Sequence, residues 1–368
     1  MPKVLHVVSA RPNFPKVAPI HRVIARRGSL EQRVVHTGQH YDPALSEVFL
    51  ADLGLPPPDF ALDTGSGSHA EQTARTLLGL EDLLDRFRPD LLTVVGDTNG
   101  ALAAALAAAK AQVRVAHVEA GLRSFDRRMP EEVNRVVIDH LADLHLTPSP
   151  DAGANLLREG IDPSRVHHVG NVMIDTLLHC LDLATARAAP ERFGLTAGGY
   201  AVSTLHRPST VDDPVALAAL LGALAGIAER LPVVLPVHPR TERTLRDPRA
   251  QAVLASAPGL RLLPPLGYLD FLSLTARARL VLTDSGGLQE ETTVLGVPCL
   301  TLRENTERPI TVEQGTNTVV GVDPDAVLRA AHEALDRPPP AAVRPELWDG
   351  HAAERVVDVY ERELGLTR

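Results

Sequence analysis

Cysteine is scarce in this chain of 368 residues, which has two, Cys180 and Cys299, far apart in sequence. They form no CxxC pair, which argues against a disulfide framework or a zinc ribbon and favours a reducing compartment. The chain has no HExxH motif and no clustered Cys/His spacing, so it predicts no metal site. It also has no apolar run approaching the ~18 residues of a membrane span and no signal h-region. We therefore expect a cytoplasmic protein without a membrane partner.

Excess positive charge is also missing, since the formal net charge is −9 and lysine and arginine are interspersed with acids. This argues against a nucleic-acid partner, although a local cluster of donors can still bind an anion. A GxGxxG fingerprint is absent, which argues against a standard NAD site, and we expect no cofactor. Hydrophobic residues make up 44% and charged residues 23%, as in globular proteins, and the length fits two domains.

Short β-branched apolar runs alternate with longer helical patterns, and the pattern restarts in the second half. The expected strands are Lys3–Ser9, Arg33–Thr37, Leu91–Gly96, Arg114–Val118, Leu144–Thr147, Tyr200–Thr204, Val233–Val237, Arg261–Leu263, Leu280–Thr283 and Cys299–Leu302. The expected helices include Glu71–Phe87, Ala101–Gln112, Ile174–Ala188, Pro214–Arg230, Thr241–Ala255, Gly287–Leu295, Asp325–Leu335 and Ala352–Leu364. Apolar strands joined by helices predict parallel sheets covered on both faces. The fold class is therefore α/β, with two doubly wound Rossmann-like domains and a cleft between them.

The domain boundary is expected between Val172 and Gly198, where one helix leads into a connector. We assign residues 1–172 to an N-terminal domain with acid–base carboxylates and residues 173–350 to a C-terminal domain. Residues 351–368 are expected to form a helix that packs back on the N-terminal domain.

Polar residues directly after the strands deserve inspection, because ligands of open parallel sheets lie beyond the C-terminal strand ends. Arg11 and Lys16 follow the first strand, where a guanidinium and an ammonium suit a phosphate, although a turn with solvated charges is an equal alternative. Gln39 and His40 follow the second strand and can hydrogen-bond a sugar. Taken alone, His40 is more often structural.

Carboxylates follow the next strands. Asp97 and Glu119 end successive strands, so their side chains could approach each other, which would raise one pKa and suit general acid–base chemistry. A helix cap is the plain alternative for Asp97. Glu131 opens a helix and points toward the cleft if Glu132 pairs with Arg135 on the helix surface.

The second half supplies complementary groups at its own strand ends. His206 and Arg207 follow one strand and His238 the next. A strand then ends in a Ser-Gly-Gly turn where a helix begins, and the backbone N–H groups of such a turn can bind an anion. Glu291, about one turn into that helix, can bind ribose hydroxyls. The residues of the turn are Ser285, Gly286 and Gly287.

Taken together, these segments resemble the non-hydrolysing UDP-N-acetylglucosamine 2-epimerases. The matching stretches run in order from residue 10 to residue 309 and are ARPNFPKVAPI, HTGQHYD, VVGDTN, AHVEAGLRSFDRRMPEEVNR, VGNVMIDTL, TLHRP, VHPRT, GYLDFL, LTDSGGLQEE and NTERP. The resemblance implies a GT-B type fold with UDP bound mainly by the second domain, and a homodimer. It also implies interconversion of UDP-GlcNAc and UDP-ManNAc, by elimination of UDP to 2-acetamidoglucal and re-addition.

The resemblance implies roles for individual residues. The acid–base candidates are Asp97, Glu119, Glu131 and His206. Substrate binding is assigned to Arg11, Lys16, Gln39, His40, Arg123, Arg207, His238, Phe271 against uracil, Ser285, Gly286, Gly287, Glu291 on ribose, and Arg308.

Ser209, Thr210 and Ile310 depart from residues common in the family. The first two leave open whether a second UDP-GlcNAc acts as an activator, and whether the substrate is a related UDP-sugar such as a diacetamido uronic acid. A hydrolysing 2-epimerase, a GT-B glycosyltransferase and a catalytically silent nucleotide-sugar sensor are further alternatives.

Overall fold

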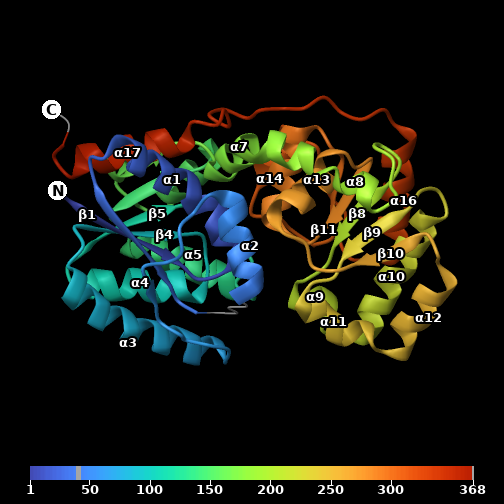
Figure 1. The fold of residues 1–368 in the computed structure, drawn as a ribbon, viewed down its shortest axis with the longest axis horizontal. Helices are drawn as coiled ribbons and strands as arrows, with labels where there is room; N and C mark the ends of the chain where they lie inside the picture. Colours follow the sequence, from blue (N-terminus) through green and yellow to red (C-terminus); the bar gives the residue numbers. More distant parts are fainter. Residues whose placement is uncertain (39–42, 367–368) are drawn as a thin grey trace. The chain divides into compact units, whose positions relative to one another are not determined.

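The computed structural model describes residues 1–38 and 43–366 and divides the chain into two compact units. Unit 1 comprises Met1–His179 with Glu346–Arg368, and unit 2 comprises Cys180–Pro345. The chain passes from unit 1 to unit 2 inside one continuous helix, α7 (Val172–Arg187), so the division between the units lies within a helix. Figure 1 shows both units as ribbons.

Unit 1 is built on a parallel sheet of seven strands in the order β3-β2-β1-β4-β5-β6-β7. The strands are β1 (Lys3–Val8), β2 (Glu31–His36), β3 (Phe60–Ala61), β4 (Leu91–Val95), β5 (Arg114–Val118), β6 (Leu144–Thr147) and β7 (Val166–His168). The helices are α1 (Phe14–Arg27), α2 (Pro43–Leu53), α3 (His69–Phe87), α4 (Asn99–Lys110), α5 (Pro130–Leu141), α6 (Pro150–Arg158) and α17 (Ala352–Glu363), with short 3-10 segments at η1 (Arg11–Asn13) and η2 (Pro163–Arg165).

Helices cover both faces of this sheet, with α3 and α4 along one face and α1 and α17 along the other (Figure 1). The core under α3 and α4 contains alanines of α4, which let that helix lie close to the strands. On the other face α17 packs on α1, where Arg27 pairs with Asp358 and Glu361, each at 2.7 Å. Asp175 of α7 accepts hydrogen bonds from the N–H groups of Ala352 and Ala353, so it holds the start of α17.

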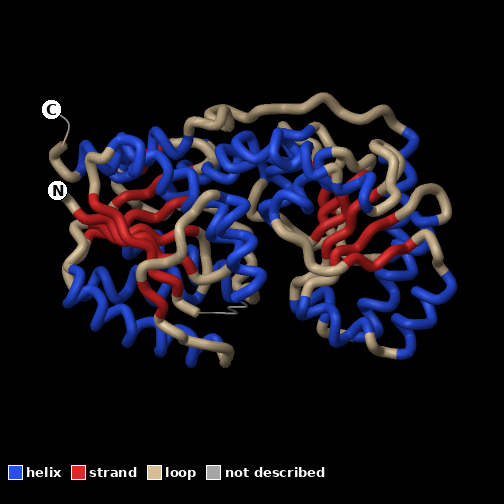
Figure 2. The backbone as a smooth tube through the Cα atoms, viewed as in Figure 1, coloured by secondary structure: helices blue, strands red, loops and turns tan. Residues whose placement is uncertain are grey.

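Unit 2 repeats the architecture with six parallel strands in the order β10-β9-β8-β11-β12-β13. The strands are β8 (Ala201–Thr204), β9 (Val233–Pro236), β10 (Leu260–Leu263), β11 (Leu280–Thr283), β12 (Cys299–Thr301) and β13 (Asn317–Val319). The helices are α8 (Ala189–Arg192), α9 (Pro208–Val211), α10 (Pro214–Ala228), α11 (Pro239–Leu245), α12 (Pro248–Ser256), α13 (Tyr268–Ala276), α14 (Gly286–Leu295), α15 (Pro309–Glu313) and α16 (Pro324–Asp336). Figure 2 shows strands enclosed by helices in each unit.

The two doubly wound Rossmann-like units confirm the predicted fold class. The single helix expected over Thr241–Ala255 is wrong, because the structure has α11 and α12 instead. Pro248 lacks an N–H and starts α12 in its first turn, and Asp247 caps that helix by accepting from the N–H of Arg249. The short strands β3, β7 and β13 were not expected and lie at sheet edges, where two or three residues carry little pattern.

The strand order reverses between β1 and β4 in unit 1 and between β8 and β11 in unit 2. Loops that leave the C-terminal ends of such neighbouring strands run to opposite sides of the sheet, which opens a crevice for a ligand. The side chains beyond these strands therefore define the candidate site of each unit.

Candidate functional site

In unit 1, Lys16 and Glu119 form a buried ion pair beside the switch point, the place between β1 and β4 where the strand order reverses. Lys16 lies in the first turns of α1, and its ammonium nitrogen is hydrogen-bonded to Oε2 of Glu119, which follows β5. The two residues are 8% and 4% exposed. A Cβ on Gly96 would lie 3.2 Å from Glu119 Oε2 and 3.4 Å from Lys16 Nζ, so the backbone after β4 touches the pair.

Glu119 has an uncommon backbone conformation for a side chain of its size, with φ at 68°. Left-handed φ values are rare outside glycine and cost on the order of 1–3 kcal/mol unless the surroundings hold them in place. Such outliers cluster at functional sites. The conformation turns the chain sharply at the end of β5 while the carboxylate stays on Lys16.

Asp97 has its own cationic partner. Arg135 of α5 donates to Oδ2 of Asp97 through Nη2 at 2.6 Å and Nε at 2.9 Å, and its Nη1 lies 2.6 Å from Glu132 Oε2. Arg135 is buried, whereas the Asp97 side chain is 30% exposed. The two carboxylates expected to crowd each other are therefore held by two separate cations.

Glu132 orders the loop that leads from Glu119 into α5. It accepts hydrogen bonds from the N–H groups of Ser124 at 2.9 Å and Phe125 at 2.8 Å, and from the Ser124 hydroxyl at 3.0 Å. The pairing of Glu132 with Arg135 is thus a buried contact and not the surface pair expected. Glu131 is partly exposed at the start of α5 and has no ion pair with another described residue.

The remaining residues assigned to unit 1 differ in their surroundings. Arg11 lies in η1 directly after β1 and is partly exposed. Arg123 is buried, with Nη1 2.7 Å from Asp139 Oδ2 and Nη2 2.7 Å from Glu159 Oε2. Burial lowers the pKa of Arg123, but these carboxylates more than offset it, so the net shift is upward. Gln39 and His40 lie outside the described residues.

In unit 2, His206 and Asp284 meet across the switch point. Nδ1 of His206 lies 2.7 Å from Asp284 Oδ1, and the N–H groups of His206 and Arg207 donate to Oδ2, each at 2.8 Å. Burial raises the pKa of Asp284, but the charge and hydrogen bonds of His206 outweigh it and bring the pKa below its usual value. Since Asp284 occupies Nδ1, Nε2 of the partly exposed imidazole is the nitrogen available to a ligand.

A candidate anion site begins at the next residue, Ser285, which occupies the N-cap position of α14. A Cβ on Gly286 would lie 2.4 Å from Arg308 Nη1, so the Arg308 guanidinium lies directly on the helix N-terminus. Arg308 is itself held by Glu307 and, through Nε at 2.8 Å, by Glu290. A helix N-terminus beside an oriented guanidinium is suited to a phosphate group.

Glu291, on α14, is fully buried and accepts a hydrogen bond from the Tyr268 hydroxyl at 2.9 Å. Burial raises the pKa of Glu291 to about 7. Phe271 is partly buried on α13, next to the Tyr268 end of that helix, and packs against the core. His238 caps α11, and its ring centroid lies 5.5 Å from that of His206.

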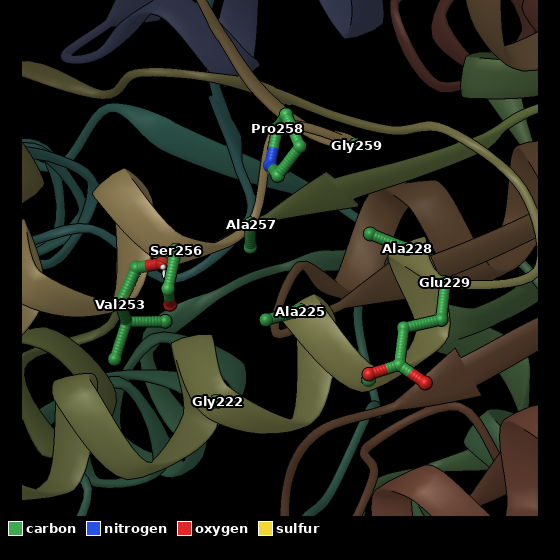
Figure 3. A pocket seen from close by; sticks show the side chains of 10 residues that line it. Gly222, Ala225, Ala228, Glu229, Val253, Ser256, Ala257, Pro258 and Gly259 are labelled. Atoms are coloured by element: carbon green, nitrogen blue, oxygen red, sulfur yellow. Dashed lines mark hydrogen bonds between the residues drawn. The ribbon is translucent and has the colours of Figure 1, made fainter.

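A separate hollow of about 470 Å³ lies in unit 2, between α10 and α12 (Figure 3). Small side chains line it, and Glu229 is the charged group among the lining residues described. It offers no cation for a diphosphate. The chemistry-bearing groups lie instead at the strand ends.

Comparison with known proteins places this geometry in a family. The family model described as UDP-N-acetylglucosamine 2-epimerase matches residues 22–361. The chain belongs to the UDP-N-acetylglucosamine 2-epimerase family. This confirms the resemblance carried by the sequence motifs.

Relatives match over nearly the whole chain. A UDP-N-acetylglucosamine 2-epimerase of Methanocaldococcus jannaschii is 39% identical over 362 residues, covering 97% of this chain and 98% of the relative. A UDP-2,3-diacetamido-2,3-dideoxy-D-glucuronate 2-epimerase of Pseudomonas aeruginosa is 40% identical over 339 residues, covering 91% of this chain and 92% of the relative. The crystal structure of the M. jannaschii enzyme with UDP-GlcNAc and UDP superposes with a TM-score of 0.90 at 38% identity, covering 98% and 99% of the two chains.

Several groups that organise the site in this family member were missed from sequence. Asp284 immediately precedes the Ser-Gly-Gly turn and could have been noticed as an acid at a strand end, but its partner His206 lies 78 positions away. Arg135 was assigned to Glu132 alone, although it also binds Asp97. Tyr268 gave no signal, because a single tyrosine in a helix fits a core position equally well.

Within the described residues, no helix is long and apolar enough to cross a membrane. In the same part of the chain, no group of three or more His, Cys, Asp or Glu side chains is arranged to hold a metal ion.

Proposed function

We propose that this protein is a non-hydrolysing 2-epimerase that interconverts UDP-GlcNAc and UDP-ManNAc. The observation that carries the proposal is the pair of cation-bound carboxylates, Asp97 with Arg135 and Glu119 with Lys16, at neighbouring strand ends of unit 1. Family membership over residues 22–361 supplies the substrate class.

The chemistry of the substrate explains why carboxylates and cations are needed together. The C2 proton of UDP-GlcNAc is not adjacent to a carbonyl, so direct deprotonation is very slow. Cleavage of the C1–O bond releases UDP and gives C1 oxocarbenium character, which acidifies C2. A carboxylate takes the C2 proton to give 2-acetamidoglucal, and cations stabilise the departing diphosphate. Re-addition of UDP, with a proton delivered to the opposite face of C2, completes the inversion.

The proposal assigns proton transfer to unit 1. Asp97 and Glu119 lie just after β4 and β5, and Glu131 joins them because it is partly exposed and has no ion pair with another described residue. Arg11 and Lys16 are proposed to contact the diphosphate or sugar. Arg123 is left out of the proposed ligands because its side chain is 1% exposed and its guanidinium is bound to Asp139 and Glu159.

UDP binding is assigned to unit 2. The N-terminus of α14 with Arg308 suits the phosphates, Glu291 suits the ribose hydroxyls, and Phe271 suits the uracil face. Nε2 of His206 is proposed to contact the β-phosphate. The remaining proposed phosphate contacts are Ser285, Gly286, Gly287, Arg207 and His238.

Proton NMR of UDP-GlcNAc turnover in D₂O tests the reaction. We expect UDP-ManNAc to appear and deuterium to enter C2 of both sugars, because the C2 proton exchanges with solvent on a carboxylate. Free ManNAc with UDP would indicate a hydrolysing enzyme, and consumption that needs an acceptor would indicate a glycosyltransferase. If UDP-GlcNAc is unchanged and unlabelled, the proposal is wrong. The same assay with UDP-2,3-diacetamido-2,3-dideoxy-D-glucuronate decides the sugar substituent.

We also propose a homodimer, as the family resemblance implies. Val133 and Val137 are exposed one turn apart on α5, at 39% and 38%, and two adjacent apolar side chains suit a protein interface. Light scattering should give twice the chain mass of 39.5 kDa. Val137→Glu should shift the mass toward one chain, whereas Val215→Glu, an exposed valine on α10 of unit 2, should not.

A further inference from the structure

A buried histidine–carboxylate pair lies behind the carboxylates of unit 1. His117 is on β5, two residues before Glu119, and Asp139 is on α5; both are fully buried. Nδ1 of His117 lies 2.6 Å from Asp139 Oδ1, and Nε2 lies 3.0 Å from the backbone oxygen of Gly96. Neither residue was singled out from sequence, and neither is among the proposed substrate ligands.

The partners of His117 determine where its protons are. A carbonyl oxygen can only accept, so Nε2 must donate to Gly96. Nδ1 faces a carboxylate, so the proton of that contact lies between His117 and Asp139. Burial raises the pKa of Asp139, but His117 and then Arg123 outweigh this and lower it, which keeps the carboxylate charged. Nε2–H of His117 therefore holds the Gly96 carbonyl, and one proton is shared in the contact between Nδ1 and Asp139.

The charged groups around His117 agree with this assignment. Arg123, from the loop after β5, places Nη1 2.7 Å from the other oxygen of Asp139. His145, opposite His117 on β6, donates through Nε2 to the backbone oxygen of Asp139 at 2.7 Å. Burial lowers the pKa of His145, and the charge of His117 lowers it further.

The pair is bonded to both turns that carry the reacting carboxylates. Gly96, directly before Asp97, donates its N–H to Val118 at 3.1 Å and accepts from His117, so both of its backbone polar groups are fixed by β5. Oδ2 of Asp139 accepts the N–H of Gly121 at 3.1 Å, which fixes the turn that follows Glu119. Gly96 and Gly121 have φ values of 69° and 82°, which glycine adopts freely, whereas Glu119 at 68° is a left-handed non-glycine residue and needs external restraint.

We infer that His117 and Asp139 are positioning residues, which set the placement of Asp97 relative to Glu119 without touching the substrate. The inference rests on the proposed epimerase function. It predicts that loss of the His117–Gly96 contact lowers kcat, because a displacement near 1 Å at a proton-transfer site costs about 100-fold. Substrate affinity is expected to change little, because UDP binding is assigned to unit 2.

Two substitutions separate the two hydrogen bonds. The amide nitrogen of glutamine can occupy the place of Nε2, so His117→Gln keeps a donor for Gly96. That of asparagine can occupy the place of Nδ1, so His117→Asn keeps a donor for Asp139 only. We expect His117→Asn to lower kcat about 100-fold with KM within about threefold, and His117→Gln to recover about tenfold of that loss. The matched control is His6→Asn, which replaces another fully buried histidine of the same sheet that, among the described residues, has no hydrogen bond to either turn.

The inference is overturned if His117→Asn and His117→Gln lose kcat equally and if His6→Asn, at the same loss of thermal stability, loses as much. That result would show a merely structural role. Nitrogen NMR of ¹⁵N-histidine-labelled wild-type protein gives a test that needs no activity. Nε2 of His117 should carry a proton, because it donates to the backbone oxygen of Gly96, and an unprotonated Nε2 overturns the inference. If the wild type does not turn over UDP-GlcNAc, the proposed function fails, while this NMR result still decides the protonation of the pair.

Discussion

Lys16 and Glu119 form a buried ion pair beyond the C-terminal end of β5, a central strand of the unit 1 sheet. Removal of one partner leaves a buried charge, which typically costs about 3–5 kcal/mol, whereas removal of both costs less. We therefore expect the losses of unfolding free energy in Lys16→Met and in Glu119→Gln to add up to more than the loss in the double variant. A double-mutant cycle in urea measures this coupling. Additive effects would show that the two groups are solvated independently.

Asp97→Asn should cut turnover by several orders of magnitude, a loss of about 3 kcal/mol or more in transition-state stabilisation. UDP affinity, measured by calorimetry, should stay the same, because the phosphate and ribose groups lie in unit 2. Asp126→Asn is the matched control, because this carboxylate lies in the same unit but pairs with the exposed Arg128. Unchanged turnover in Asp97→Asn would remove Asp97 from the mechanism.

Glu291 predicts a pH dependence of stability. Burial raises its pKa in the folded protein to about 7 from 4.5, so the folded state holds more protons than the unfolded state between these values. Stability from this group is present below about pH 4.5 and is lost as pH rises through 7, by on the order of 3 kcal/mol. Unfolding free energies of the wild type and Glu291→Gln, measured across this range, should show the slope in the wild type only. Parallel curves would contradict the prediction.

Gly286→Ala should weaken UDP binding and destabilise unit 2. The added methyl would lie 2.4 Å from Arg308 Nη1 and 2.5 Å from Glu307 Oε1, so the buried pair must move off the helix N-terminus. Gly222→Ala is the control on α10, beside the hollow of Figure 3, where a Cβ meets nothing within 4 Å. It should stabilise the protein by about 0.5–1 kcal/mol through helix propensity. Equal UDP affinity in the two variants would contradict the assigned phosphate site.

Arg135→Met should lower kcat and loosen the loop that begins at Glu119. Arg135 holds Asp97 and Glu132, and Glu132 in turn holds the N–H groups of Ser124 and Phe125. Hydrogen exchange of those two amides should rise together with the loss of activity. Arg135→Lys keeps the charge but cannot bridge both carboxylates with the same planar fork, so it should rescue only part of kcat. Full rescue by lysine would show that charge alone matters.

The sequence by itself determined the α/β class, the two parallel sheets and the strand ends where polar residues gather. The patterns that indicate strands and helices are set by residues close together in the chain, so they can be read from the sequence. Ligand sites of parallel sheets lie where the strands end. Asp97, Glu119, His206 and the turn at Ser285 could be singled out on that basis. Edge strands such as β13 could not, because three residues hold too little periodicity.

Only the tertiary structure decided which charges meet. Asp97 and Glu119 were expected to repel each other. Instead, α1 brings Lys16 to Glu119 across 103 positions, and α5 brings Arg135 to Asp97 across 38 positions. Arg123 is of a residue type that binds phosphates, yet its guanidinium is paired with Asp139 and Glu159. Such pairings depend on how helices pack on the sheet, and packing joins residues whose separation in sequence carries no pattern.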